Sequence, residues 1–169
     1  EVKIVVFDKT GTITKGKPEV REIFSKVKEN YLLDIAGSLE KLSEHPLSKA
    51  IVNKADLKKY RKVTGFKVLR GKGVEGKMGK NEIIIGNSVL MKEKKISLKD
   101  FEDYIQKFEE KGYTTIVVSE NHKAMGIIGI ADAVKEDSLN AIFELKEMGL
   151  KVVMITGDNE RTAKVIAEQ

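Results

Sequence analysis

The chain has 169 residues, of which 41% are hydrophobic and 34% are charged, and its formal net charge is +5. No stretch approaches the roughly 20 apolar residues that a transmembrane helix requires. The absence of cysteine excludes a disulfide framework and a thiolate metal site. Lysines are interspersed with acidic residues and no aromatics interleave a basic stripe, so we expect a solvated surface of mixed charge and no nucleic-acid partner.

The first predicted element is a short apolar run at residues 4–7, followed at once by the string DKTGTIT from Asp8 to Thr14. Such a run is typical of a buried parallel strand that ends in a loop. A carboxylate at the C-terminal end of a parallel strand lies where open α/β sheets bind ligands. Asp8 is therefore a candidate nucleophile, and the loop after it offers backbone N–H groups and hydroxyls to a phosphoryl group.

The middle of the chain predicts an α+β section with an antiparallel sheet. Helices are expected over residues 31–42, from Pro46 onward and over residues 98–111. Strands are expected, with turns between them, at residues 66–69, 74–78, 82–85, 115–118 and 125–130.

Two strings in this middle section are candidates for function. SEHPL, at residues 43–47, also suits an ordinary helix cap. GKGVEG, at residues 71–76, also suits a glycine-rich β-turn. The second string fits G-x-G-x-x-G, but a dinucleotide fingerprint needs a strand before it and a helix after it. Here the string lies between two strands, so we reject that interpretation.

The C-terminal part repeats the pattern of the first segment. A helix over residues 136–148, closed by Gly149, leads to an apolar strand at 151–155 and then to Thr156-Gly157-Asp158-Asn159. This order of elements predicts a parallel sheet. Taken alone, the last string also suits a strand-to-helix turn with Asp158 or Asn159 as N-cap.

The strings DKTGT, SEHPL, GxG, DAVK at residues 132–135 and TGD occur in this order along essentially the whole chain. They resemble the heavy-metal (copper-type) transporting P-type ATPases, which are relatives of the haloacid-dehalogenase-like phosphatases. The resemblance implies an α/β fold, with an incomplete haloacid-dehalogenase-like Rossmann domain and an inserted α+β nucleotide-binding domain built on an antiparallel sheet. It predicts phosphorylation-domain segments at 1–16 and 132–169, around a nucleotide-binding domain at 17–131.

The resemblance also implies roles for individual residues. Asp8 would accept the γ-phosphoryl group of ATP, and Asp8 with the Thr10 carbonyl would bind Mg²⁺. Thr156 and Gly157 would hold the phosphoryl oxygens. The implied catalytic set is Asp8, Lys9, Thr10, Thr156, Gly157 and Asp158.

The nucleotide-binding residues implied by the resemblance come from the middle section. Glu40 would accept a hydrogen bond from the adenine amino group, and His45 would contact the adenine. Gly71 and Gly73 would let ATP lie against the backbone. Because Glu40 ends one predicted helix and His45 opens the next, both side chains are expected to face one cleft.

The family pattern continues with a lysine that contacts the phosphoryl group and a segment whose aspartate binds magnesium, and neither is in this sequence. We therefore expect part of an ATP-driven membrane pump, lying at the cytoplasmic face of a cell membrane and unable to complete turnover by itself. Its partners would be ATP and the pump's membrane and actuator domains. The transported ion, expected to be copper, would bind outside this chain.

Two other functions stay open from the sequence. One is a soluble haloacid-dehalogenase-like phosphatase with a cap insertion. Those phosphatases carry a second acid two positions after the nucleophile for general acid–base catalysis, and this chain has Thr10 there, which favours a persistent phosphoenzyme. The other is a non-catalytic nucleotide-binding module, which would bind ATP without becoming phosphorylated.

Overall fold

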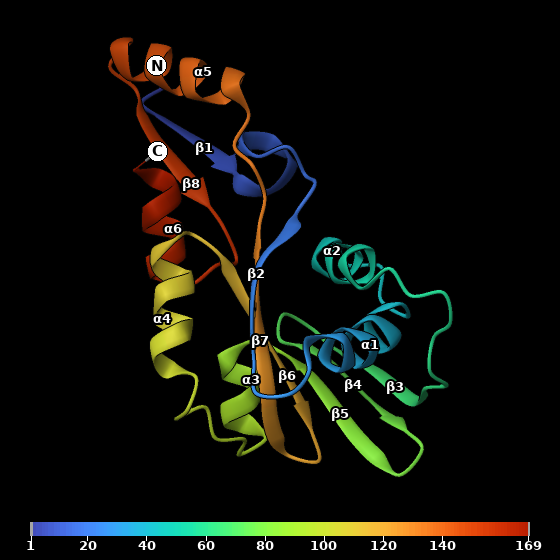
Figure 1. The fold of residues 1–169 in the computed structure, drawn as a ribbon. Helices are drawn as coiled ribbons and strands as arrows, with labels where there is room; N and C mark the ends of the chain where they lie inside the picture. Colours follow the sequence, from blue (N-terminus) through green and yellow to red (C-terminus); the bar gives the residue numbers. More distant parts are fainter. Residues whose placement is uncertain (1, 169) are drawn as a thin grey trace.

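The computed structural model describes residues 2–168, which form two sheets of different kinds (Figure 1). The strands, in chain order, are β1 (Ile4–Asp8), β2 (Glu19–Ser25), β3 (Thr64–Leu69), β4 (Gly73–Met78), β5 (Asn81–Gly86), β6 (Thr114–Glu120), β7 (Lys123–Ala131) and β8 (Lys151–Ile155). The α-helices are α1 (Glu29–Glu40), α2 (Pro46–Ala55), α3 (Ser88–Glu93), α4 (Glu102–Glu110), α5 (Glu136–Glu147) and α6 (Glu160–Ala167).

The larger sheet has six antiparallel strands in the order β2-β7-β6-β5-β4-β3. The predicted hairpins β3–β4, β4–β5 and β6–β7 are confirmed by their strand registers. Asn121 and His122 both have positive φ at the β6–β7 turn, which is the backbone geometry that a two-residue hairpin loop needs. The antiparallel sheet expected for the middle of the chain is therefore present.

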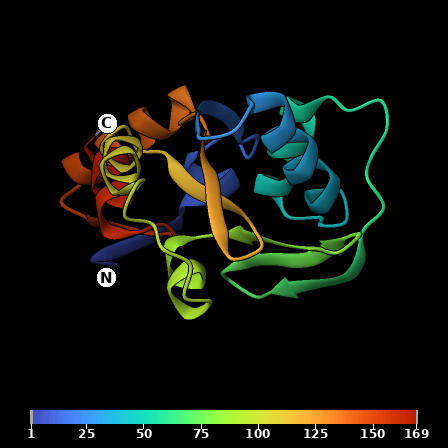
Figure 2. The same cartoon turned by 60° about the horizontal axis from the view of Figure 1, so that its bottom comes forward.

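Helices cover both faces of this sheet, so its central strands are apolar along their length. Ile83 and Ile85 pack in a core with α1 and α2, whereas Ile84 packs in a second core with α3 and α4. The alternation follows from the strand geometry, in which successive side chains point to opposite faces. Figure 2 shows α1 and α2 on one side of β3–β5 and α3 on the other.

The smaller sheet consists of β1 and β8, which pair in parallel with Asp8 beside Ile155. Few hydrophobic side chains are buried around this sheet. No residue of α5 is buried, and Val6, Phe143 and Ile155 are more than half exposed. Helix α6 packs against α4 of the other layer (Figure 1). Outside residues 32–130, Ile13 is the single buried hydrophobic residue in the part of the chain that the structure describes.

Some predicted boundaries were wrong. The helix expected over 98–111 begins only at Glu102, because Leu98 to Phe101 form a separate turn, in which the Phe101 N–H bonds to the Leu98 carbonyl at 2.7 Å. That turn places the Phe101 ring in the core. Strand β2 and helix α3 were not predicted. None of the helices in residues 2–168 is long and apolar enough to cross a membrane.

Candidate functional site

The two predicted phosphate-binding loops lie at the same edge of the smaller sheet. Asp8 ends β1 and is exposed, and its neighbour in register, Ile155, directly precedes Thr156 and Gly157. Because the two strands are parallel, their C-terminal ends meet at one edge. A Cβ at Gly157 would meet no heavy atom within 4 Å, so there is open space beside that loop. The structure thus brings together these two parts of the predicted catalytic set.

The loop after Asp8 is held in place by the buried hydroxyl of Thr14. Residues Lys9–Ile13 form a π-type turn, closed by the Thr14 N–H, which donates to the Lys9 carbonyl at 3.0 Å. Thr14 is 1% exposed, and its Oγ1 accepts from the Gly11 N–H at 3.2 Å. Thr10 and Gly11 remain exposed. The buried Thr14 therefore fixes a loop whose backbone is open to solvent beside Asp8.

Lys9 and Asp158, both predicted to belong to the catalytic set, form a largely buried ion pair with each other. Asp158 also accepts hydrogen bonds from Thr156 Oγ1 at 2.9 Å and from Thr114 Oγ1 at 2.7 Å. Burial opposes ionisation of Asp158, but the bonds from Lys9, Thr114 and Thr156 outweigh it and hold its pKa below the usual value. Thr114 was not predicted, since no motif marks the first residue of β6.

Asp132, in the DAVK string, ties together the two chain segments that connect the sheets. Its carboxylate accepts hydrogen bonds from Thr14 Oγ1 at 2.6 Å, from the Gly16 N–H at 2.9 Å and from the Lys17 N–H at 3.1 Å. Lys135 adds a bond from its Nζ to the Gly11 carbonyl at 2.9 Å. The DAVK string therefore braces the loop of Asp8 as well as the connection between the sheets.

Glu40 and His45 differ sharply in their surroundings. Glu40, the last residue of α1, is 5% exposed, and its Oε2 accepts a hydrogen bond from the Ser48 hydroxyl at 2.5 Å. Burial raises the pKa of Glu40 to about 7, and the Ser48 bond opposes that rise. His45 is the exposed N-cap of α2, and its Nδ1 accepts from the Leu47 N–H at 3.2 Å. Both side chains belong to the junction of the same two helices.

Gly71 and Gly73 serve different purposes in the turn between β3 and β4. A Cβ at Gly73 would lie 2.0 Å from the Ile85 carbonyl oxygen, so a side chain there is excluded by β5. At Gly71, where φ is +71°, no heavy atom lies within 4 Å of the Cβ position. Asn87 Nδ2 donates to the Gly71 carbonyl at 3.1 Å. Strand packing explains Gly73, whereas the positive φ of Gly71 favours glycine in a turn that lies open to solvent.

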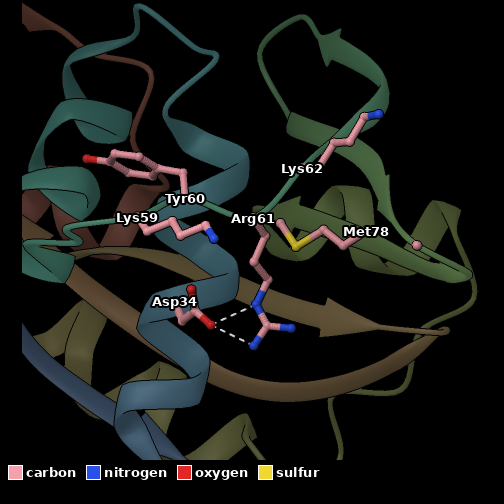
Figure 3. A pocket seen from close by; sticks show the side chains of 7 residues that line it. Asp34, Lys59, Tyr60, Arg61, Lys62 and Met78 are labelled. Atoms are coloured by element: carbon pink, nitrogen blue, oxygen red, sulfur yellow. Dashed lines mark hydrogen bonds and ion pairs between the residues drawn. The ribbon is translucent and has the colours of Figure 1, made fainter.

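A hollow of about 510 Å³ lies between α1 and the start of β3, with Asp34 and Arg61 paired inside it (Figure 3). Its lining residues are Asp34, Lys59, Tyr60, Arg61, Lys62, Met78 and Gly79. None of the predicted nucleotide-binding residues lines this hollow.

The residues present offer few protein ligands to a metal ion. Residues 2–168 contain no group of three or more His, Cys, Asp and Glu side chains placed to hold one. Asp8 is exposed, whereas Asp158 is bonded to Lys9. This donor set fits Mg²⁺, which commonly takes one or two carboxylates and completes its shell with water and substrate phosphates.

Comparison with known proteins places the chain in a family. The haloacid dehalogenase-like hydrolase family matches residues 2–169. A copper-exporting P-type ATPase of Staphylococcus saprophyticus is 39% identical in an alignment over 171 residues, which covers 100% of this chain and 21% of that protein. The chain thus spans about a fifth of the length of this relative.

Two solved structures share the fold. A zinc-transporting PIB-type ATPase in its E2·Pi state is 34% identical, with a TM-score of 0.69 over 99% of this chain and 28% of its own. The catalytic domain of the CPx-ATPase CopB-B, described for its conformational changes upon nucleotide binding, is 27% identical. Its TM-score is 0.74 over 99% of this chain and 57% of its own.

Proposed function

The chain belongs to the haloacid dehalogenase-like hydrolase family, and we propose that it is the ATP-binding and phosphorylation part of a heavy-metal-transporting P-type ATPase. In this proposal residues 17–131 bind the nucleotide, and segments 1–16 and 132–169 belong to the phosphorylation domain. The transported ion is copper, as the name of the staphylococcal relative suggests, and the whole protein lies in a membrane with this part at its cytoplasmic face.

The observation that carries the proposal is the meeting of Asp8 with the Thr156-Gly157 loop at one edge of the parallel sheet. An exposed carboxylate beside open backbone is suited to nucleophilic attack on phosphorus. Catalysis of phosphoryl transfer depends mainly on positioning and on charge stabilisation, and little on covalent chemistry by other side chains.

In the proposed reaction a carboxylate oxygen of Asp8 attacks the γ-phosphorus of ATP, and ADP leaves. The Gly157 N–H and the Thr156 hydroxyl hold the transferring oxygens. In the structure that hydroxyl is bonded to Asp158, so it must turn toward the phosphoryl group. Asp8 and the Thr10 carbonyl, together with the ATP phosphates, would hold Mg²⁺, which would supply charge neutralisation there.

Lys9 and Asp158 contribute to this reaction indirectly, as a buried ion pair that connects the two loops. Their mutual ion pair leaves neither charge free, and it joins the Asp8 loop directly to the loop of Thr156. We propose that the pair keeps the two loops in register, so that the nucleophile and the phosphoryl-binding backbone stay in one geometry.

Phosphorylation is tested on the full-length protein with γ-labelled ATP. Acid-stable label is expected on the wild type and is expected to vanish in Asp8→Asn, because the amide is not a nucleophile. Asp103→Asn, which changes an exposed acid of α4, is the matched control and should label normally. Labelling that survives Asp8→Asn would refute Asp8 as the acceptor.

Nucleotide binding is tested on residues 1–169 by NMR titration with a non-hydrolysable ATP analogue. Shifts are expected around residues 40–45 and 71–73, with affinity in the micromolar to millimolar range, roughly 4–8 kcal/mol. His45→Gln should weaken binding while leaving the other amide shifts in place. Shifts confined to the hollow of Arg61 and Tyr60 would place the nucleotide elsewhere.

A further inference from the structure

A chain of hydrogen bonds joins the two proposed adenine-binding residues. The Ser48 hydroxyl lies 2.5 Å from Glu40 Oε2 and 2.8 Å from Ser43 Oγ. Ser43 Oγ in turn accepts from the His45 N–H at 3.3 Å. Ser48 stands in the first turn of α2 and is 4% exposed, so it is enclosed between the helices.

The direction of this chain follows from counting hydrogens. Ser48 has one hydroxyl hydrogen, and an ionised carboxylate only accepts. While Glu40 is ionised, Ser48 must donate to Oε2, so the Ser43 hydroxyl must donate to Ser48. When Glu40 is protonated, it can donate to Ser48 and the two hydroxyls can turn the other way. All the hydrogen bonds of this series are therefore made in both states, but only the ionised state offers a carboxylate that accepts at both oxygens.

The second carboxylate oxygen is the one left for a ligand. No hydrogen-bond partner of Glu40 Oε1 lies within residues 2–168. Oε1 is also not among the fully enclosed unpartnered side-chain atoms of that part of the chain, of which Thr115 Oγ1 is the single example. Oε1 therefore keeps access to the surface, while Oε2 is held by Ser48.

We propose that Ser48 is a positioning residue of the nucleotide site, whose hydroxyl holds Glu40 Oε2 so that Oε1 faces the amino group of adenine. This inference rests on the proposed binding of ATP at Glu40 and His45. Its consequence is that Ser48 contributes to the choice of adenine over guanine, since guanine presents a carbonyl where adenine presents an amino group. A carbonyl against a carboxylate leaves two acceptors facing each other.

The Ser48 hydroxyl also affects the pH at which Glu40 becomes an anionic acceptor. Burial raises the pKa of Glu40 to about 7, and the Ser48 bond lowers it. Without that bond the carboxyl should titrate at higher pH. The ionisable side chains that follow Glu40 along the chain, up to Lys49 in the first turns of α2, are all exposed: Lys41, Glu44, His45 and Lys49. On β4, Glu75 pairs with Lys94.

The experiment compares ATP and GTP binding to residues 1–169 across pH 5.5–8.5, by NMR titration of the wild type, Ser48→Ala and Ser43→Ala. Ser119→Ala is the matched control, because Ser119 is also a buried hydroxyl but bonds to the Ile84 carbonyl in β5. Glu40→Gln supplies the background from every other group whose protonation changes in this pH range.

Wild-type affinity for ATP should rise as the pH rises through about 7, because Glu40 then becomes an anionic acceptor, whose hydrogen bond to the adenine amino group is stronger. Ser48→Ala should weaken ATP binding roughly tenfold at pH 7, reduce the preference over GTP and move the pH midpoint upward. The loss should shrink toward pH 8.5, which a merely structural defect would not do. Ser43→Ala, at a half-buried position, should show the same changes more weakly even if Ser48→Ala fails to fold.

Two results would overturn the inference, and they are distinguishable. If ATP shifts residues 40–45 but both serine variants keep the wild-type midpoint and selectivity, Ser48 has no positioning role and the proposed function stands. If ATP leaves residues 40–45 unshifted in the wild type, the proposed nucleotide site itself is wrong, and the inference fails with it.

Discussion

The six-stranded sheet and the β1–β8 sheet are stabilised by different kinds of interaction. The first has helices on both faces and two hydrophobic cores. Within residues 2–168, the second sheet with its loops and helices contributes one buried hydrophobic residue, Ile13. It is joined to the rest by the Lys9–Asp158 pair, by Asp132 and by the contact of α6 with α4.

The difference shows where this chain combines rigidity with reactivity. Of the proposed nucleotide residues, Glu40 and His45 lie at the ends of helices that pack on a hydrophobic core, so their geometry depends on apolar burial. The proposed phosphoryl acceptor stands on a thin sheet whose loops are held by charge and hydrogen bonds. Regions with few buried apolar contacts open locally at lower free energy. The β1–β8 region, meaning the β1–β8 sheet with its loops and with α5 and α6, should therefore open before the larger sheet does.

The largest expected effect compares the same truncation in both regions. Leu32→Ala removes a side chain that is 0% exposed in the core, and should lower the free energy of unfolding by about 3–5 kcal/mol. Leu139→Ala, in α5, removes one that is 45% exposed and should cost less than about 1 kcal/mol. Urea denaturation measures both. If both variants lost the same free energy of unfolding, Leu139 would have to be buried in solution, and the contrast between the two regions would be wrong.

The next effect belongs to the larger region and depends on pH. The folded-state pKa of Glu40 is raised from 4.5 to about 7, so its protonated form stabilises the fold below pH 4.5. That contribution is lost as the pH rises through about 7, and it amounts to about 3 kcal/mol. Glu40→Gln should remove this dependence, as measured by urea denaturation from pH 4.5 to 8. Glu29→Gln, at an exposed position of α1, should keep it.

A smaller effect tests how the β1–β8 region is held. Asp158→Asn leaves Lys9 buried without its anionic partner and should cost about 2 kcal/mol, which corresponds to roughly thirtyfold faster amide exchange in β8. Exchange in β5 should not change, because β5 lies inside the larger sheet. Asp137→Asn, at an exposed acid of α5, is the control. If β5 and β8 accelerate together, the two regions open as one unit.

The smallest effect concerns the connection between the regions. Asp132→Asn keeps the side-chain shape but removes one of the two acceptor oxygens that receive Thr14, Gly16 and Lys17. A loss of about 1 kcal/mol is expected, seen as roughly fivefold faster exchange of the Gly16 and Lys17 amides. Unchanged exchange there would show that the backbone hydrogen bond between Lys15 and Ala133 holds the two connecting segments together without Asp132.

Short-range patterns located most elements of this fold. The apolar run before Asp8 and the turn at Asn121 and His122 carry their information within a few neighbouring residues, so they could be read from the chain. Strand β2 was missed because a register shift between Val20 and Glu22 interrupts the alternation of polar and apolar residues that would have marked a strand. Helix α4 was predicted too long, because core packing of Phe101 overrides the helical pattern there.

The sequence by itself determined the types of residue available to the candidate site and their order: the strand-end Asp8, the Thr156-Gly157 loop and the helix junction that carries Glu40 and His45. Only the tertiary structure decided which of these groups are free and which are already bonded. Lys9 and Asp158 are 149 positions apart and Thr114 and Asp158 are 44 apart, so no local pattern contains their contacts. Ser48 meets Glu40 because α1 packs on α2, and burial at that junction, a property of the folded chain alone, raises the pKa of the carboxyl.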